Sequence, residues 1–205
     1  MRRKRVAVLI SGRGSNMMAL VEGAKEKDYP AEIALVLSNR PEAEGLKAAE
    51  GASIKTALVD HTAFGPDREA FDRAIQAELF ENRIDIVCLG GFMRLLTPWF
   101  VRQWEGNILN IHPALLPAFK GLDTHRRALA AGMKAHGASV HYVVAELDSG
   151  PVIAQGVVPV LSDDTPETLG ERVLAMEHRL YPMVLKLLAG GKVRVINGKV
   201  QIDDN

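Results

Sequence analysis

The alternation of short β-rich runs with longer helical patterns is the feature that most constrains how this chain can fold. Phe71, Ile75 and Leu79 recur at every fourth position, as on the buried face of an amphipathic helix. Strands that alternate with such helices build βαβ units around a sheet. The β-rich runs before residue 112 are 6–10, 32–37, 56–59, 84–89 and 108–111.

The character of these runs predicts how the strands pair. Residues 6–10 and 84–89 are almost continuously apolar, as is typical of parallel strands covered on both faces. The later runs 138–144 and 152–160 flank a short polar stretch at 146–150, which favours antiparallel pairing. We therefore predict an α/β fold with a Rossmann-like, mainly parallel central sheet, helices on both faces and antiparallel C-terminal strands.

The last part of the chain contains a helix signal and a hairpin signal. Thr165, followed by proline, is a typical N-cap, and apolar residues then recur at spacings of three and four until Gly190. The dipeptide Asn197-Gly198 separates two short β-rich runs, and it tolerates the positive φ angles of a two-residue turn. We therefore expect a long helix and then a hairpin over residues 193–202.

Size and composition favour one folded unit. A chain of 205 residues lies near the upper end of ordinary single-domain size, so we expect a single domain over residues 1–205. Its 47% hydrophobic content supplies a core, which excludes disorder as the main state. The 25 basic and 25 acidic residues cancel, so no overall field favours a nucleic-acid partner.

The sequence also predicts a cytoplasmic protein. Cys88 is the only cysteine, which fits a reducing compartment. Basic residues 2–5 precede an apolar run that is too short for a signal peptide. No apolar run approaches the roughly 20 residues that cross a bilayer, so we expect no membrane partner.

A glycine-rich loop follows the first β-rich run. Residues 11–16 read Ser-Gly-Arg-Gly-Ser-Asn, and such glycines let backbone amides approach an anion at the start of the next helix. The dinucleotide fingerprint would need a glycine where Met17 stands. We predict a single phosphate held by backbone amides and by the side chains of Ser15 and Asn16. A glycine-rich turn without a ligand is the alternative.

Three polar residues form a candidate reaction centre. Asn110 and His112 lie two positions apart on an apolar run and so face the same way. An amide beside an imidazole can hydrogen-bond a carbonyl oxygen as it gains negative charge. Asp148, in a tight turn, would stabilise a charged imidazole if it met His112. Taken singly, these residues are as compatible with purely structural roles.

The remaining histidines and the cysteine predict no further chemistry. None of the five histidines other than His112 shows the sequence spacing of a familiar metal site, so we expect no metal. Cys88 lies within an apolar run, which favours a buried core position over a nucleophile. The histidines concerned are His61, His125, His136, His141 and His178.

Five segments taken together resemble the phosphoribosylglycinamide formyltransferases of purine biosynthesis. They are residues 11–16, 91–94 (Gly-Phe-Met-Arg), 110–117 (Asn-Ile-His-Pro-Ala-Leu-Leu-Pro), 136–141 (His-Gly-Ala-Ser-Val-His) and 147–153 (Leu-Asp-Ser-Gly-Pro-Val-Ile). The likeness spans essentially the whole chain. It implies transfer of a formyl group from the cosubstrate 10-formyltetrahydrofolate to the glycinamide amine of phosphoribosylglycinamide, in de novo purine (IMP) biosynthesis.

The resemblance also implies site residues. Asn110 and protonated His112 would stabilise the developing oxyanion, and Asp148 would hold His112. Residues that would bind the ribonucleotide are Gly14, Ser15, Asn16 and Glu177. Residues that would bind the folate are Arg68, Met93, Arg94, Leu95, Leu96 and Asn110. Taken alone, Glu177 and Arg68 are as typical of solvated helix positions.

Other functions stay open at this point. Families that formylate initiator methionyl-tRNA carry an additional C-terminal RNA-binding domain, and formyltetrahydrofolate hydrolases carry an additional N-terminal regulatory domain; we expect neither here. A noncatalytic nucleotide-binding module is the alternative from a different class. For the assembly we expect a monomer or a homodimer.

Overall fold

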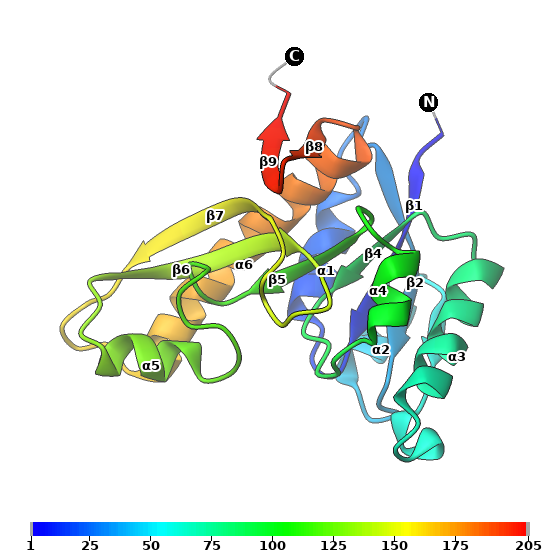
Figure 1. Ribbon diagram of the computed structural model, residues 1–205, viewed down its shortest axis with the longest axis horizontal. Coiled ribbons are helices and arrows are strands. Elements are labelled where there is room, and N and C mark those ends of the chain that lie inside the picture. The colour runs from blue at the N-terminus through cyan, green and yellow to red at the C-terminus, as the bar shows by residue number, and fades with distance from the viewer. Residues whose placement is uncertain (1, 204–205) are drawn as a thin grey trace.

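Strands and helices alternate along the chain as the sequence pattern predicts (Figure 1). The computed structural model describes residues 2–203. The strands are β1 (Lys4–Ile10), β2 (Ala31–Ser38), β3 (Thr56–Leu58), β4 (Ile86–Leu89), β5 (Ile108–His112), β6 (Ala135–Tyr142), β7 (Val152–Pro159), β8 (Val193–Ile196) and β9 (Lys199–Ile202). The helices are α1 (Ser15–Gly23), α2 (Glu44–Gly51), α3 (Arg68–Glu81), α4 (Pro98–Gln103), α5 (Thr124–Ala130) and α6 (Pro166–Ala189), with a 3-10 helix η1 (His61–Phe64).

The central sheet has seven strands in the order β3-β2-β1-β4-β5-β6-β7. The five strands from β3 to β5 run parallel, whereas β6 is antiparallel to both of its neighbours, β5 and β7. Strands β8 and β9 form a separate antiparallel pair. The predicted α/β fold, with its mainly parallel Rossmann-like sheet and antiparallel C-terminal strands, is confirmed.

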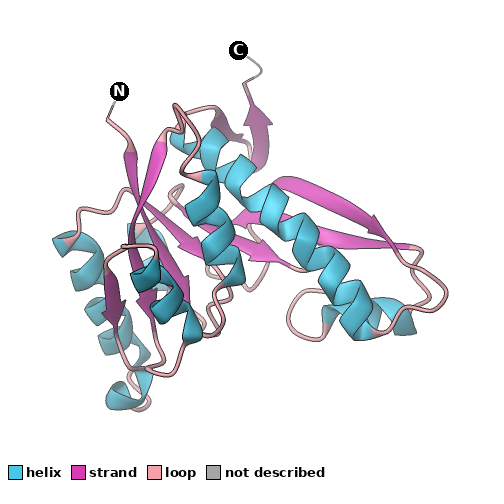
Figure 2. Cartoon of the chain, turned by 180° about the vertical axis from the view of Figure 1, so that it is seen from behind, coloured by secondary structure: helices cyan, strands magenta, loops and turns pink. Residues whose placement is uncertain are grey.

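Helices cover both faces of the sheet, and the side chains of β1 alternate between the two layers. Val6, Val8 and Ile10 join the apolar core beneath α1, α2 and α6. Ala7 and Leu9 join the opposite core, beneath α3 and α4. Figure 2, which shows the molecule from behind, has the long helix α6 crossing in front of the sheet. Burial on both faces explains why the β1 run is continuously apolar.

The strand predicted at residues 84–89 starts later than expected. Arg83 takes a φ of 52°, in the left-handed region. The amide of Ile84 then donates back to the carbonyl of Leu79 at 3.0 Å, within the end of α3. This bond is typical of a helix C-terminus, so it keeps residue 84 out of the strand.

Strand β6 lies earlier than the predicted run 138–144. Its pairing with β7 begins at Ala135, opposite Pro159. Beyond Tyr142 the chain leaves the ladder and enters the segment that contains Asp148. The sequence pattern therefore placed both the start and the end of this strand too late in the chain.

Helix α6 is fastened to the sheet by hydrogen bonds as well as by apolar contact. The buried hydroxyl of Tyr181 lies 3.1 Å from the carbonyl oxygen of Leu89 and 3.2 Å from that of Leu109. The hydroxyl of Tyr29 donates to the carbonyl of Pro182 at 2.7 Å. A tyrosine ring contributes apolar area while its hydroxyl satisfies a buried acceptor. These contacts fix the position of α6 relative to the strands that carry the site.

The predicted C-terminal elements are confirmed. Helix α6 begins after Thr165, whose side chain accepts a hydrogen bond from the amide of Thr168. Asn197 and Gly198 take φ values of 51° and 75°, as a two-residue turn between β8 and β9 requires. Among residues 2–203, no helix combines the length and the apolar character needed to cross a membrane.

Close contact between β6 and β7 predicts that Gly137 tolerates no side chain. A Cβ at Gly137 would collide with the carbonyl oxygen of Gly156. We expect Gly137→Ala to lower the free energy of unfolding by about 3 kcal/mol, measured by urea denaturation. Gly51→Ala is the control, because a Cβ there has no neighbour within 4 Å. It should change stability by less than about 1 kcal/mol. Equal stabilities of the two variants would contradict this packing.

Candidate functional site

The predicted reaction centre lies where β5 meets β6. Asn110 and His112 lie on β5, and the intervening Ile111 points into the core. The antiparallel register sets Asn110 opposite His141 and His112 opposite Ser139. Directly opposed residues in such a pair bring their side chains into contact. The pairing of two strands therefore assembles four polar side chains.

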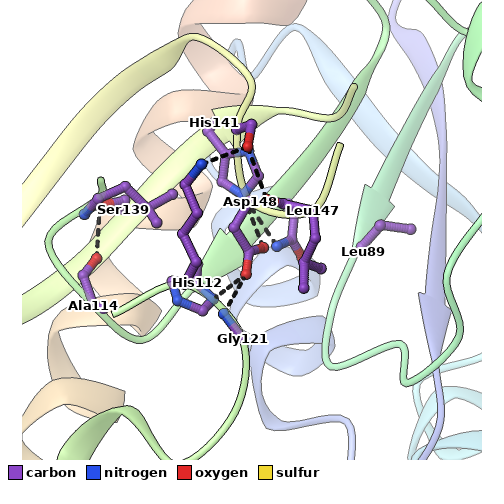
Figure 3. Close-up of polar contacts among 12 residues, drawn as sticks. Leu89, His112, Ala114, Gly121, Ser139, His141, Leu147 and Asp148 are labelled. Carbon is purple, nitrogen blue, oxygen red and sulfur yellow. Dashed lines mark hydrogen bonds and ion pairs between the residues drawn. The ribbon is translucent and has the colours of Figure 1, made fainter. Parts of the chain in front are cut away.

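His112 and Asp148 form a buried pair. Nδ1 of His112 lies 3.4 Å from Oδ2 of Asp148, and both side chains are only 7% exposed. The backbone amide of Gly121 donates to the same Oδ2 at 2.9 Å. Figure 3 shows the Asp148 carboxylate with His141 on one side and with His112 and Gly121 on the other. Asp148 itself has a φ of 49°, so a tight turn aims its carboxylate at the imidazole.

The second nitrogen of His112 meets a backbone carbonyl. Nε2 lies 2.9 Å from the carbonyl oxygen of Phe119. A carbonyl only accepts hydrogen bonds, so Nε2 carries a proton and donates it. The other nitrogen, Nδ1, faces the Asp148 carboxylate, which can accept a hydrogen bond from it.

His141 is a member of the cluster that the sequence did not predict. Its Nδ1 lies 2.8 Å from the carbonyl oxygen of Tyr142, so that nitrogen is the donor. Burial lowers the pKa of His141, against smaller opposing effects of Tyr142 and Asp148, and favours the neutral ring. Nε2 is then the acceptor and receives a hydrogen bond from Nδ2 of Asn110 at 3.2 Å. His141 therefore fixes the orientation of the Asn110 amide.

Ser139 fixes the segment that follows β5. Its hydroxyl donates to the carbonyl of Ala114 at 2.7 Å and accepts from the amide of Leu116 at 3.0 Å. Gln155 on β7 donates to the same hydroxyl and to the carbonyl of Leu116, each at 2.9 Å. The peptide bond between Leu116 and Pro117 is cis. The chain beyond His112 is thus held against β6 and β7.

The glycine-rich loop lies at the start of α1, as predicted. Gly14 is the N-cap with a φ of 75°, and a Cβ there would lie 3.0 Å from Cα of Gly45. Asn16 is 9% exposed, and its Nδ2 donates to Oε2 of Glu177 at 2.7 Å. Among the described residues, Oδ1 of Asn16 has no hydrogen-bond partner. The helix start therefore combines free amides with a buried amide side chain.

Glu177 is buried, so the solvated interpretation of this residue is wrong. It is 5% exposed and lies on the face of α6 that packs against α1. Burial raises its pKa to about 7, and the hydrogen bond from Asn16 opposes this shift. A carboxyl group with such a pKa changes its charge near neutral pH. The helix packing thus brings together Asn16 and Glu177, which are 161 positions apart.

The predicted folate residues lie between β4 and α4, beside the start of α3. Arg68 donates a hydrogen bond to the carbonyl of Leu95, and the Arg94 guanidinium lies 6.0 Å from the centre of the Phe71 ring. Met93 and Leu95 are 61% and 58% exposed. Leu96 instead packs into the core beneath α3 and α4, so only its backbone could meet a ligand.

No metal-binding arrangement accompanies these residues. Across residues 2–203, histidine, cysteine, aspartate and glutamate side chains form no group of three or more that could hold a metal ion. His125 and His136 pack edge to face with ring centres 5.3 Å apart. Burial lowers the pKa of His136 to about 4 and also lowers the pKa of His125, so both rings favour the neutral form.

Comparison with known proteins decides the family. The model of the family described as formyl transferase matches residues 4–185. This chain belongs to the formyl transferase family. The matched region of this formyl transferase contains β1 to β7 and nearly all of α6. It therefore includes the glycine-rich loop, the cluster at β5 and β6, and Glu177.

Individual relatives agree with this assignment. The chain is 42% identical to phosphoribosylglycinamide formyltransferase of Escherichia coli, covering 97% of this chain and 93% of that protein. It is 49% identical to the trifunctional purine biosynthetic protein adenosine-3 of Gallus gallus, but spans about a fifth of that protein's length (19%). The solved structure of glycinamide ribonucleotide transformylase 1 from Symbiobacterium toebii is similar with a TM-score of 0.95 and 44% identity, covering 98% of this chain and 95% of that one.

The charge of Glu177 predicts a pH-dependent stability. Because its folded pKa of about 7 lies above the ordinary value of 4.5, the native state binds the proton more tightly than the unfolded chain does. Stability is therefore lost as the pH rises through this interval. Relative to wild type, Glu177→Gln should gain up to about 3 kcal/mol between pH 4.5 and pH 8, measured by urea unfolding.

The matched control for this prediction is Glu171→Gln. Glu171 lies on the same helix, but its side chain is exposed. Its substitution should leave the pH dependence of unfolding close to that of the wild type. A Glu177→Gln variant that follows the wild-type stability at every pH would contradict the buried, protonated state of Glu177.

Proposed function

We propose that this chain transfers the formyl group of 10-formyltetrahydrofolate to the glycinamide amine of phosphoribosylglycinamide, in purine biosynthesis. The observation that carries the proposal is the buried His112–Asp148 pair beside Asn110, at the same edge of the sheet as the glycine-rich loop. The likeness to phosphoribosylglycinamide formyltransferase of Escherichia coli over 93% of that protein supports the same activity.

The ribonucleotide is assigned to the loop before α1 and to α6. The amides of Gly14, Ser15 and Asn16 suit a phosphate, because a helix start presents unpaired N–H groups and a positive dipole end. We assign Glu177, whose carboxyl group accepts a hydrogen bond from Asn16, to the remainder of that substrate. A buried carboxyl group beside such a loop has a clearer role in recognising a polar ligand than in stabilising the fold.

The folate is assigned to the segment between β4 and α4. The exposed side chains of Met93 and Leu95 offer apolar contact, and the backbone of Leu96 lies beside them. Arg68 and Arg94 supply cations for the glutamyl carboxylates. Asn110, one strand further along the sheet, would contact the part of the folate that carries the formyl group.

The geometry supports direct transfer without a covalent enzyme intermediate. The neutral amine attacks the formyl carbon and a new carbon–nitrogen bond forms. Asn110 and His112 stabilise the oxygen as it becomes negative, and for this the Nε2–H of His112 exchanges the Phe119 carbonyl for the formyl oxygen when the substrates are bound. The bond from the formyl carbon to the folate nitrogen then breaks, and the proton released by the amine ends on that nitrogen. Asp148 holds the His112 ring through Nδ1, and His141 keeps the Asn110 amide aligned.

Product analysis tests the assignment. Purified protein is mixed with phosphoribosylglycinamide and 10-formyltetrahydrofolate, and we expect the formylated nucleotide and tetrahydrofolate in equal amounts. Formate without formylated nucleotide would instead indicate a formyltetrahydrofolate hydrolase. A parallel reaction replaces phosphoribosylglycinamide by initiator methionyl-tRNA. Formylation of this tRNA and not of phosphoribosylglycinamide would indicate a methionyl-tRNA formyltransferase. Nucleotide binding without turnover would indicate a noncatalytic module.

A substitution at His112 tests the mechanism. His112→Ala removes a group that acts mainly on the transition state, so kcat should fall about 10²- to 10⁴-fold while KM for both substrates changes little. Steady-state kinetics measure both constants, and calorimetry checks that phosphoribosylglycinamide still binds. Losses of similar size in kcat and in substrate affinity would point to a positioning role for His112.

The location, partners, assembly and domain organisation of the protein remain predictions that agree with the proposed function. A formyltransferase of purine biosynthesis acts on small soluble substrates, which agrees with the cytoplasmic location predicted from the sequence. The absence of nucleic-acid and membrane partners stays a prediction, as does an assembly of one or two chains. The assignment of residues 1–205 to a single domain likewise rests on chain length and composition.

A further inference from the structure

The Ser11 hydroxyl joins the two loops that the proposed function assigns to different substrates. Ser11 is 6% exposed and directly precedes Gly12 in the glycine-rich loop. Its Oγ accepts a hydrogen bond from the amide of Met93 at 2.7 Å. The same hydroxyl donates to Oδ1 of Asn39 at 2.6 Å. One buried oxygen is therefore both donor and acceptor between separate segments.

The sheet order explains why this residue holds a central position. β1 lies between β2 and β4, and all three strands are parallel. Ser11, Asn39 and Met93 each lie in the segment that follows one of these strands, so they meet at one edge of the sheet. The strand order reverses here, because β2 and β3 are added on one side of β1 and β4 and β5 on the other. Open α/β sheets place their ligands at such a point.

The two loops are joined by few polar contacts. Within residues 2–203, the Ser11–Met93 hydrogen bond is the only one that joins residues 11–16 to residues 91–97. Each loop has a separate attachment elsewhere. The carbonyl of Gly12 accepts from the amide of Gly45 at 3.0 Å, whereas the amide of Thr97 donates to Asp72 at 2.6 Å. A change in either loop can therefore reach the other through Ser11.

We propose that Ser11 is a positioning residue that couples the ribonucleotide subsite to the folate subsite. This inference rests on the proposed function, which assigns residues 14–16 to the ribonucleotide and residues 93–96 to the folate. The bond forms only when both loops are placed for it. A ligand that holds one loop in that position lowers the cost of ordering the other, so each substrate tightens the binding of its partner.

The test uses a ternary complex that cannot react. Tetrahydrofolate lacks the formyl group, so calorimetry can measure the Kd of phosphoribosylglycinamide with and without saturating tetrahydrofolate. For the wild type we expect binding to be about fivefold or more tighter with tetrahydrofolate present. The reverse titration must give the same factor, because coupling between two sites is reciprocal.

Ser11→Ala removes both hydrogen bonds and should bring the coupling factor close to one, since one such bond accounts for about a fivefold effect. Ser11→Thr keeps the hydroxyl and should restore the coupling. Ser38→Ala is the matched control, because Ser38 is fully buried and its hydroxyl makes two hydrogen bonds, both to the backbone of Arg40. That variant should keep the wild-type coupling factor.

A second measurement needs no variant and therefore does not depend on how Ser11→Ala folds. Hydrogen exchange at the Met93 amide reports the bond directly. Binding of phosphoribosylglycinamide alone should slow this exchange severalfold, although Met93 belongs to the other subsite. A purely structural Ser11 would leave the exchange rate unchanged, and that result would overturn the coupling.

The outcomes separate this inference from the function on which it rests. Product formation with equal Kd values in the presence and absence of tetrahydrofolate would overturn the coupling and leave the function intact. Retained coupling in Ser11→Ala, or its loss in Ser38→Ala, would also contradict the role of Ser11. Failure of both ligands to bind the wild type would overturn the proposed function and the coupling together.

Discussion

The antiparallel pairing of β6 with β5 is the constraint on which the candidate site depends. The register sets Asn110 opposite His141 and His112 opposite Ser139. A slip by one residue would turn every side chain of β6 to the other face, so the hydrogen bond between Asn110 and His141 could not form. The register is specified because Val140 and Ala138 are fully buried on the core face. Core packing on one side of β6 thus fixes the chemistry on the other.

Two buried carboxyl groups oppose the stability of this arrangement. Asp148 and Glu177 are 9% and 5% exposed, and burial of a charge is unfavourable unless hydrogen bonds compensate. The Gly121 amide and the His112 ring lie against the Asp148 carboxylate, whereas within residues 2–203 the Glu177 carboxyl group has one side-chain hydrogen-bond partner, Asn16. Glu177 accordingly keeps its proton to about neutral pH. The two buried carboxyl groups therefore differ in the number of polar partners that surround them.

The sequence predicts elements of this fold better than it predicts contacts between them. Continuous apolar runs and the cap at Thr165 are local signals, and they identified the parallel strands and α6. Strand spacing and short motifs predicted Asn110, His112 and Asp148 as one cluster, and the fold brings them together. The role of His141 depends on strand register, and the burial of Glu177 depends on how α6 packs on α1. Neither contact has a local signal, because each joins residues that only the complete fold brings together.

Hydrogen-bond geometry also decides a point that residue types leave open, namely which partner each nitrogen of the His112 ring meets. The motif places a histidine beside an amide, but either ring nitrogen could then face the reaction. The Phe119 carbonyl occupies Nε2 as an acceptor, and Asp148 faces Nδ1. A ring held in this way has one nitrogen against a carboxylate and the other against a backbone group. In the proposed mechanism the Nε2–H must leave the Phe119 carbonyl to reach a substrate oxygen, so the segment around Phe119 determines whether His112 is available to the substrate.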